Sequence, residues 1–163
     1  MARALIVGCG CRGRELGREL VGQGWQVRGT SRRPDGLDAI GTAGIEPAMA
    51  DPDRAGTVLE LCADVAVAIW LLGSAGGEPE AISAIHGPRL ASLLEKLVDS
   101  PVRGFAYEAT GSVAADVLSE GARITELVGE RYRIPVALLA DDRSDAGWAE
   151  RTAATVAGLL AAG

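Results

Sequence analysis

The sequence predicts an α/β protein in which one parallel β-sheet is covered by helices on both faces. Short apolar segments alternate with helix-like segments along the chain, and a glycine-rich turn follows the first apolar segment. Of the 163 residues, 48% are hydrophobic but only 4% are aromatic, so small and branched aliphatic side chains must form the core. That composition is usual for a parallel sheet buried on both faces.

The glycine-rich turn lies between an expected strand over residues 3–8 and an expected helix over residues 11–23. Its glycines, Gly8, Gly10 and Gly13, form a G-x-G-x-x-G pattern. In a dinucleotide-binding βαβ unit the first makes the tight turn, the second lets the backbone approach a pyrophosphate, and the third allows close helix packing. The helix N-terminus adds N–H groups for phosphate. A turn that binds nothing is the alternative.

The later elements follow the same alternation. Further strands are expected over residues 26–30, 44–49, 64–72, 102–108 and 135–140, and further helices over 51–62, 88–99, 114–130 and from the polar loop 141–145 to about 160. Pro47 places the third strand at a sheet edge, which fits the strand order 3-2-1-4-5-6. Asp51 is expected to cap the next helix, with Pro52 at its first position.

About six strands in alternation with helices predict a three-layer, doubly wound parallel sheet, the Rossmann fold. We expect this one domain to occupy residues 1–163, without a separate substrate domain. The high apolar content is also compatible with a homo-oligomer.

The charge and the apolar pattern exclude several classes of partner. The net charge is −6 and no long basic block occurs, so we expect no nucleic-acid partner. No apolar run approaches the roughly 18 residues of a membrane span, and no signal-peptide pattern begins the chain. With no disulfide pattern among three cysteines, the sequence favours a cytoplasmic protein without membrane contact.

The first expected helix begins with Cys11 and Arg12. Cys9 and Cys11 do not predict a metal site, because the chain has a single histidine and Cys62 is far away in sequence. Small residues that fill a tight turn explain them better, although a thiol at a helix N-terminus makes Cys11 a candidate for redox sensitivity. Arg12 would add a cation beside a bound dinucleotide.

The end of the second strand indicates which dinucleotide would bind. NAD-binding units carry an acidic residue there for the ribose 2′-OH, but this chain has Thr30, Ser31, Arg32 and Arg33, with no acid before Asp35. A 2′-phosphate is bound well by hydroxyl donors and by arginine. NADP(H) is therefore favoured over NAD(H). The alternative is an ordinary solvated loop.

Four segments resemble atypical and extended short-chain dehydrogenases/reductases over about residues 3–113: GCGCRGREL (8–16), GTSRRP (29–34), the acidic turn at Asp51, and FAYEATGSV (105–113). The resemblance implies an NAD(P)-binding Rossmann fold. It implies that Asp51 contacts adenine and that Leu72, Gly73 and Ser74 run beside the cofactor. It also implies that Thr110 or Ser112 is the catalytic hydroxyl residue.

The chain departs from this family in its catalytic pair, Tyr-x-x-x-Lys. Tyr107 is followed by Gly111 four residues later and Tyr132 by Val136, and the only lysine, Lys96, precedes both tyrosines. A tyrosine with an ordinary pKa of about 10 needs a neighbour that lowers it before it can donate a proton near neutral pH. The usual reductase mechanism is therefore not supported.

Four residues remain as catalytic candidates: Thr110, Ser112, Glu108 and His86. His86 follows the fourth strand and has an ordinary pKa near 7, but it also fits a turn before the next helix. Glu108 ends the fifth strand, where open α/β sheets bind ligands. It is either a ligand contact or general base, or it pairs with an arginine. Asp141 and Asp142 fit helix caps better.

Two functions remain open after these observations. The first is an NADP(H)-dependent oxidoreductase that acts on an unknown small molecule without the Tyr-Lys pair. The second is a non-catalytic dinucleotide-binding or redox-sensing module that acts through a protein partner. A variant of the first completes its active site across a dimer interface.

Overall fold

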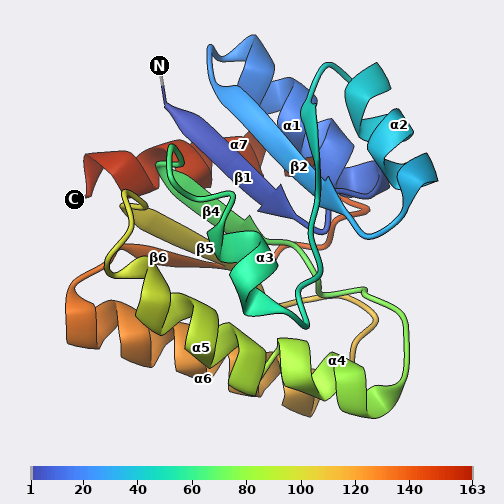
Figure 1. Ribbon diagram of the computed structural model, residues 1–163. Coiled ribbons are helices and arrows are strands. Elements are labelled where there is room, and N and C mark those ends of the chain that lie inside the picture. The colour runs from blue at the N-terminus through green and yellow to red at the C-terminus, as the bar shows by residue number, and fades with distance from the viewer. Residues whose placement is uncertain (1, 163) are drawn as a thin grey trace.

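A computed structural model describes residues 2–162 and shows one sheet of six parallel strands with helices on both faces (Figure 1). The strands are β1 (Arg3–Val7), β2 (Gln26–Ser31), β3 (Glu46–Met49), β4 (Val67–Trp70), β5 (Gly104–Glu108) and β6 (Val136–Leu139). Their order, β3-β2-β1-β4-β5-β6, confirms the expected doubly wound topology and places β3 at an edge.

The helices are α1 (Cys11–Gly22), α2 (Pro34–Thr42), α3 (Ala55–Leu59), α4 (Pro79–Ile85), α5 (Pro88–Leu97), α6 (Ala115–Tyr132) and α7 (Trp148–Ala161). Among residues 2–162 no helix combines the length and the apolarity needed to cross a bilayer.

Two apolar clusters hold the three layers together, one on each face of the sheet. Successive strand residues point to opposite faces, so in β1 the side chain of Ile6 packs with α1 and α7, and that of Leu5 with α3 and α5. Trp70, at the end of β4, is fully buried on the second face. Figure 1 shows α1, α2 and α7 over one face and α3, α5 and α6 over the other.

The predicted start of the helix at Asp51 is wrong. That helix, α3, begins at Ala55 and has five residues. Asp51 instead closes a turn: its carbonyl accepts from the Arg54 N–H at 2.9 Å, and its Oδ1 accepts from the Asp53 N–H at 3.0 Å. The N-cap of α3 is Arg54, so Pro52 lies before the helix and not at its first position.

Sequence patterning missed two helices, and it made the fourth strand too long. Only Ile40 of α2 and Ile85 of α4 are buried, so neither helix has the apolar stripe that reveals a helix in sequence. The apolar run around β4 continues to Leu72, but the strand ends at Trp70. The residues that follow turn toward a cavity and remain buried there.

Candidate functional site

The glycine turn after β1 has the expected tight geometry. Gly8 has a φ of +87°, and a Cβ there would lie 2.6 Å from Leu72 Cδ2 and 2.7 Å from the Leu71 carbonyl oxygen. Its N–H donates to Thr30 Oγ1 at 3.2 Å. The Cys9 N–H donates to the Thr30 carbonyl at 3.0 Å. Position 8 therefore requires glycine, and the turn is fixed against the end of β2.

The other two glycines of the motif differ in their surroundings. A Cβ on Gly10 would have no heavy atom within 4 Å, whereas one on Gly13 would lie 3.2 Å from the Gly8 carbonyl oxygen and 3.3 Å from Ile6 Cγ2. Gly10 is the N-cap of α1 and provides no side-chain hydrogen bond to the helix end. The turn thus leaves open space and unsatisfied N–H groups at the start of α1, as an anion site requires.

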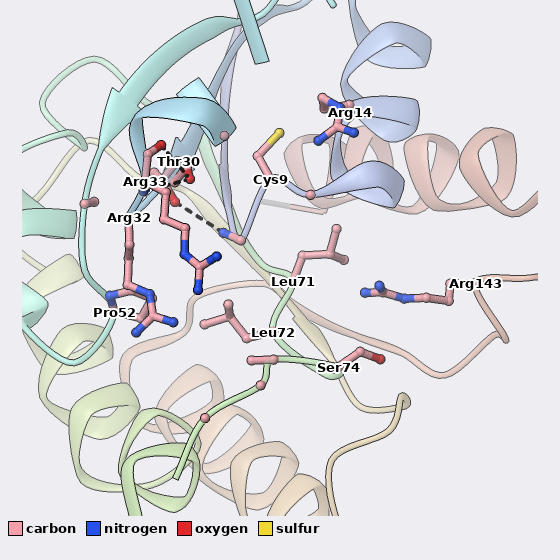
Figure 2. A pocket seen from close by; sticks show the side chains of 18 residues that line it. Cys9, Arg14, Thr30, Arg32, Arg33, Pro52, Leu71, Leu72, Ser74 and Arg143 are labelled. Carbon is pink, nitrogen blue, oxygen red and sulfur yellow. Dashed lines mark hydrogen bonds between the residues drawn. The ribbon is translucent and has the colours of Figure 1, made fainter. Parts of the chain in front are cut away.

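A cavity of about 570 Å³ lies beside this turn at the carboxyl edge of the sheet (Figure 2). Its volume is within the range of about 300–1,000 Å³ that is common for small-molecule and cofactor sites. The lining residues include four arginines and no acidic residue, although the chain as a whole is acidic. The arginines are Arg14, Arg32, Arg33 and Arg143. Such a wall favours an anionic ligand.

The structure brings most of the expected cofactor residues together on this cavity. They are Gly8, Gly10, Thr30, Ser31, Arg32, Arg33, Leu72 and Ser74. The cavity is not lined by Cys11, Arg12 or Gly13, the first residues of α1, nor by Gly73, which follows Leu72 in sequence. Arg12 forms an ion pair with Glu15 at 2.6 Å. Asp51 lies with Arg32 on a smaller adjoining cavity of about 210 Å³.

Cys9 fills the space between the turn and β2. It is 4% exposed, and a Cβ on Gly29 would lie 2.6 Å from its Sγ. Burial raises the pKa of the Cys9 thiol to about 12. Cys9 is therefore a packing residue at neutral pH, as the tight-turn interpretation expects. Cys11 is exposed, and its redox sensitivity stays a prediction.

Arg143 is the site residue that sequence reasoning missed. It lies in the loop between β6 and α7, and its Nη2 donates to both oxygens of Glu108 at 2.8 Å. Glu108 is 1% exposed and also accepts from the Gly73 N–H at 2.7 Å. Of the alternatives for Glu108, pairing with an arginine is the one observed. A carboxylate at the end of a central strand was the only sequence signal for such a partner.

His86 forms the turn between α4 and α5 and is 1% exposed. Its Nε2 lies 3.0 Å from the Leu72 carbonyl oxygen, and its Nδ1 lies 2.6 Å from the Tyr107 hydroxyl. A carbonyl can only accept, so Nε2 carries the proton and Nδ1 accepts from Tyr107. Burial lowers the pKa of His86 and raises that of Tyr107. His86 does not line the cavity.

Thr110 and Ser112 lie in the loop that follows β5, which packs against the loop after β4. The Ser112 N–H donates to Ser74 Oγ at 3.1 Å, and the Val113 N–H donates to the Gly73 carbonyl at 2.9 Å. Neither Thr110 nor Ser112 lines the cavity, and their catalytic role stays a prediction. Within residues 2–162, no group of three or more histidine, cysteine or acidic side chains is placed to hold a metal ion.

No family model and no curated protein matches this sequence. Solved structures do share its fold. UDP-glucuronic acid 4-epimerase from Bacillus cereus, in complex with NAD, has a TM-score of 0.67 at 14% identity over 83% of this chain and 54% of its own. Triphenylmethane reductase from Citrobacter sp., complexed with NADP(H), has a TM-score of 0.63 at 17% identity over 85% and 49%.

A short-chain dehydrogenase from Streptomyces avermitilis is similar to the same degree, with a TM-score of 0.63 at 16% identity over 84% of this chain and 63% of its own. The chain thus spans about half to under two thirds of the length of these proteins. At such low identity the comparison shows a shared fold: the chain has the Rossmann fold that these proteins also have, which confirms the expected fold class.

Proposed function

We propose that this protein binds NADP(H) in the cavity beside the glycine turn and belongs to the oxidoreductase-type dinucleotide-binding proteins. The observation that supports this proposal is the lining of the cavity. It combines an open glycine turn at a helix N-terminus with arginines, and it contains no acidic residue. In this arrangement the pyrophosphate lies against Gly10 and the first turn of α1, and the adenosine half lies over β2.

The end of β2 supports NADP(H) over NAD(H). Arg32 and Arg33 line the cavity, and neither guanidinium takes part in an ion pair within the described residues. The Arg33 N–H donates to Ser31 Oγ at 3.1 Å, which fixes the turn that carries both arginines. Two cations on a cavity wall that pair with no acidic group of residues 2–162 match a 2′-phosphate.

Calorimetric titration with NADPH and NADH side by side tests this proposal. The wild type should bind NADPH more tightly than NADH. Arg32→Ala should weaken NADPH by about 10- to 100-fold, the effect of one lost hydrogen bond to a charged group, and NADH by less than about 2-fold. Arg123→Ala, which removes an exposed arginine paired with Glu120 on α6, is the matched control. Equal losses for both nucleotides would remove the argument for a 2′-phosphate.

The glycine turn gives an independent test. Gly10→Ala should leave the stability nearly unchanged, because its methyl group meets no protein atom within 4 Å. In the complex the same methyl group would occupy the space of the pyrophosphate, so NADPH affinity should fall at least about 10-fold. Gly22→Ala, at the other end of α1 and equally unobstructed, should bind NADPH like the wild type. If Gly10→Ala binds NADPH as tightly as the wild type, the pyrophosphate does not lie against the glycine turn.

A non-catalytic dinucleotide-binding module is the second candidate function. His86, Thr110 and Ser112 do not line the cavity, and the Glu108 carboxylate is buried against Arg143. These positions favour binding without hydride transfer. Steady consumption of NADPH with any member of a panel of small aldehydes, ketones and quinones would favour the enzyme. Tight binding without consumption of NADPH would favour the module.

A further inference from the structure

Arg143 lies at the end of the cavity opposite Arg32 and Arg33, with Leu71 and Leu72 between them (Figure 2). It comes from the loop between β6 and α7, and its ion pair with Glu108 places it over the end of β5. The Gly73 N–H donates to the same carboxylate, so the segment that follows β4 also contacts Glu108. In a doubly wound sheet, β4 and β5 belong to the second mononucleotide-binding half.

The guanidinium of Arg143 is fixed on one side and open on the other. Its Nε and Nη2 donate to the Glu108 carboxylate at 3.3 Å and 2.8 Å. Its Nη1, with two N–H groups, has no hydrogen-bond partner within residues 2–162. The side chain is 28% exposed, whereas that of Glu108 is 1% exposed. The buried carboxylate therefore holds an arginine whose remaining donors face the cavity.

The charges of a dinucleotide already have other partners in the proposed complex. The pyrophosphate lies at the glycine turn and the 2′-phosphate at Arg32 and Arg33, both on the β1–β2 side of the cavity. Arg143 lies on the opposite side, where the reactive half of the cofactor would lie. Arginine in a fixed orientation is well suited to carboxylate or phosphate recognition.

We propose that Arg143 binds the carboxylate or phosphate group of a second, small ligand beside the reactive half of the dinucleotide. This inference rests on the proposed function and names the substrate class for that site, a small organic acid or phosphate ester. Glu108 neutralises one unit of charge, so the site has little net positive charge with which to attract an anion from solution. A simple anion should therefore bind weakly and saturably, and its charge should be essential.

The test is calorimetric titration of the NADPH-saturated protein with inorganic phosphate and with malonate, at constant ionic strength. Malonamide, which has a similar shape without charge, is the ligand control. At least one anion should bind the wild type saturably and malonamide should not. Arg143→Gln should weaken that anion by about 10- to 100-fold, as expected for a lost hydrogen bond to a charged group. The same variant should lose less affinity for NADPH than for the anion.

Two further variants separate recognition from folding. Arg151→Gln removes another arginine of the same region, which pairs with Asp141 at 3.1 Å and does not line this cavity, so it should bind the anion like the wild type. If Arg143→Gln does not fold, Arg143→Lys keeps the charge opposite Glu108 but loses the planar fork. It should then fold and bind the anion at least about 5-fold more weakly.

The outcomes distinguish this inference from the proposed function. Binding of NADPH by the wild type with no binding of either anion would overturn the inference alone. An equal loss of NADPH and anion affinity in Arg143→Gln would also overturn it, because the dinucleotide itself would then be the ligand of Arg143. Binding of an anion that depends on Arg143, in a wild type that binds no dinucleotide, would support the anion site and refute the proposed function.

Discussion

The parallel sheet has an amino edge, where its strands begin, and a carboxyl edge, where they end. Each carries ion pairs between arginine and carboxylate side chains, and the carboxylates differ in burial. At the amino edge, Arg28 donates to Asp64 at 2.8 Å and to Glu46 at 2.9 Å, and both carboxylate side chains are 52% exposed. At the carboxyl edge, Arg143 donates to a Glu108 carboxylate that is 1% exposed. The carboxylates are solvated at the amino edge and buried at the carboxyl edge, whereas the arginines show the reverse order, 11% exposed for Arg28 and 28% for Arg143.

This difference shows why the two clusters have different consequences. Water competes for the groups of an exposed ion pair, so such pairs contribute about 0–1 kcal/mol. A buried carboxylate depends on its partner, because its charge is expensive without one. The carboxyl edge is also where loops diverge at the switch point between β1 and β4 and leave a crevice for ligands. The buried carboxylate at that edge therefore holds a partly exposed arginine beside a cavity.

Removal of the arginine at each edge should give the largest difference in the free energy of unfolding. Arg143→Ala leaves the Glu108 charge buried without its partner and should lower the free energy of unfolding by about 3 kcal/mol. Arg28→Ala leaves carboxylates that water solvates, and should cost about 1 kcal/mol. Urea denaturation of the two variants at neutral pH measures both values. Equal losses would show that burial does not separate the two clusters.

The buried His86 should make the carboxyl side of the molecule sensitive to mild acid. Because burial lowers its pKa in the folded protein, the unfolded chain binds the proton first as the pH falls below the ordinary value of about 6.5. Stability should therefore be complete above that pH and decrease toward pH 5, by at most about 1.4 kcal/mol per pH unit for one proton.

Urea denaturation between pH 7.5 and 5 measures this slope. The chain has one histidine, so His86→Gln should remove the slope whatever its own stability. A slope of the same size in His86→Gln would assign the pH dependence to other groups.

The smallest effect is expected at the amino edge, from Asp64. The Arg28 hydrogen bond lowers the pKa of this carboxyl, so its contribution is present above the ordinary value of about 3.9 and is lost as the pH falls through the lowered value. Asp64→Asn should cost less than about 1 kcal/mol at pH 7, and less again in high salt. Chemical denaturation at low and high salt measures it; a loss as large as that of Arg143→Ala would contradict the comparison.

Local patterns were sufficient wherever a segment's own chemistry decides its structure. The strands, their order and the glycine turn follow from apolar runs, Pro47 at an edge and the spacing of the glycines. Prediction failed where burial is slight or turns compete: α2 and α4 each bury one side chain, and Asp51 closes a turn instead of capping α3. These features depend on neighbours that a local window does not contain.

By itself the sequence determined the fold class and the tight geometry of the glycine turn. Steric crowding at Gly8 and side-chain periodicity both act over a few residues. Only the tertiary structure decided the role of Glu108. Its partner Arg143 is 35 residues away in sequence, and the two meet because β5 and β6 are adjacent and parallel, so their carboxyl ends share one edge. Strand order and burial, which no short segment encodes, placed this carboxylate in the interior and its arginine beside a cavity.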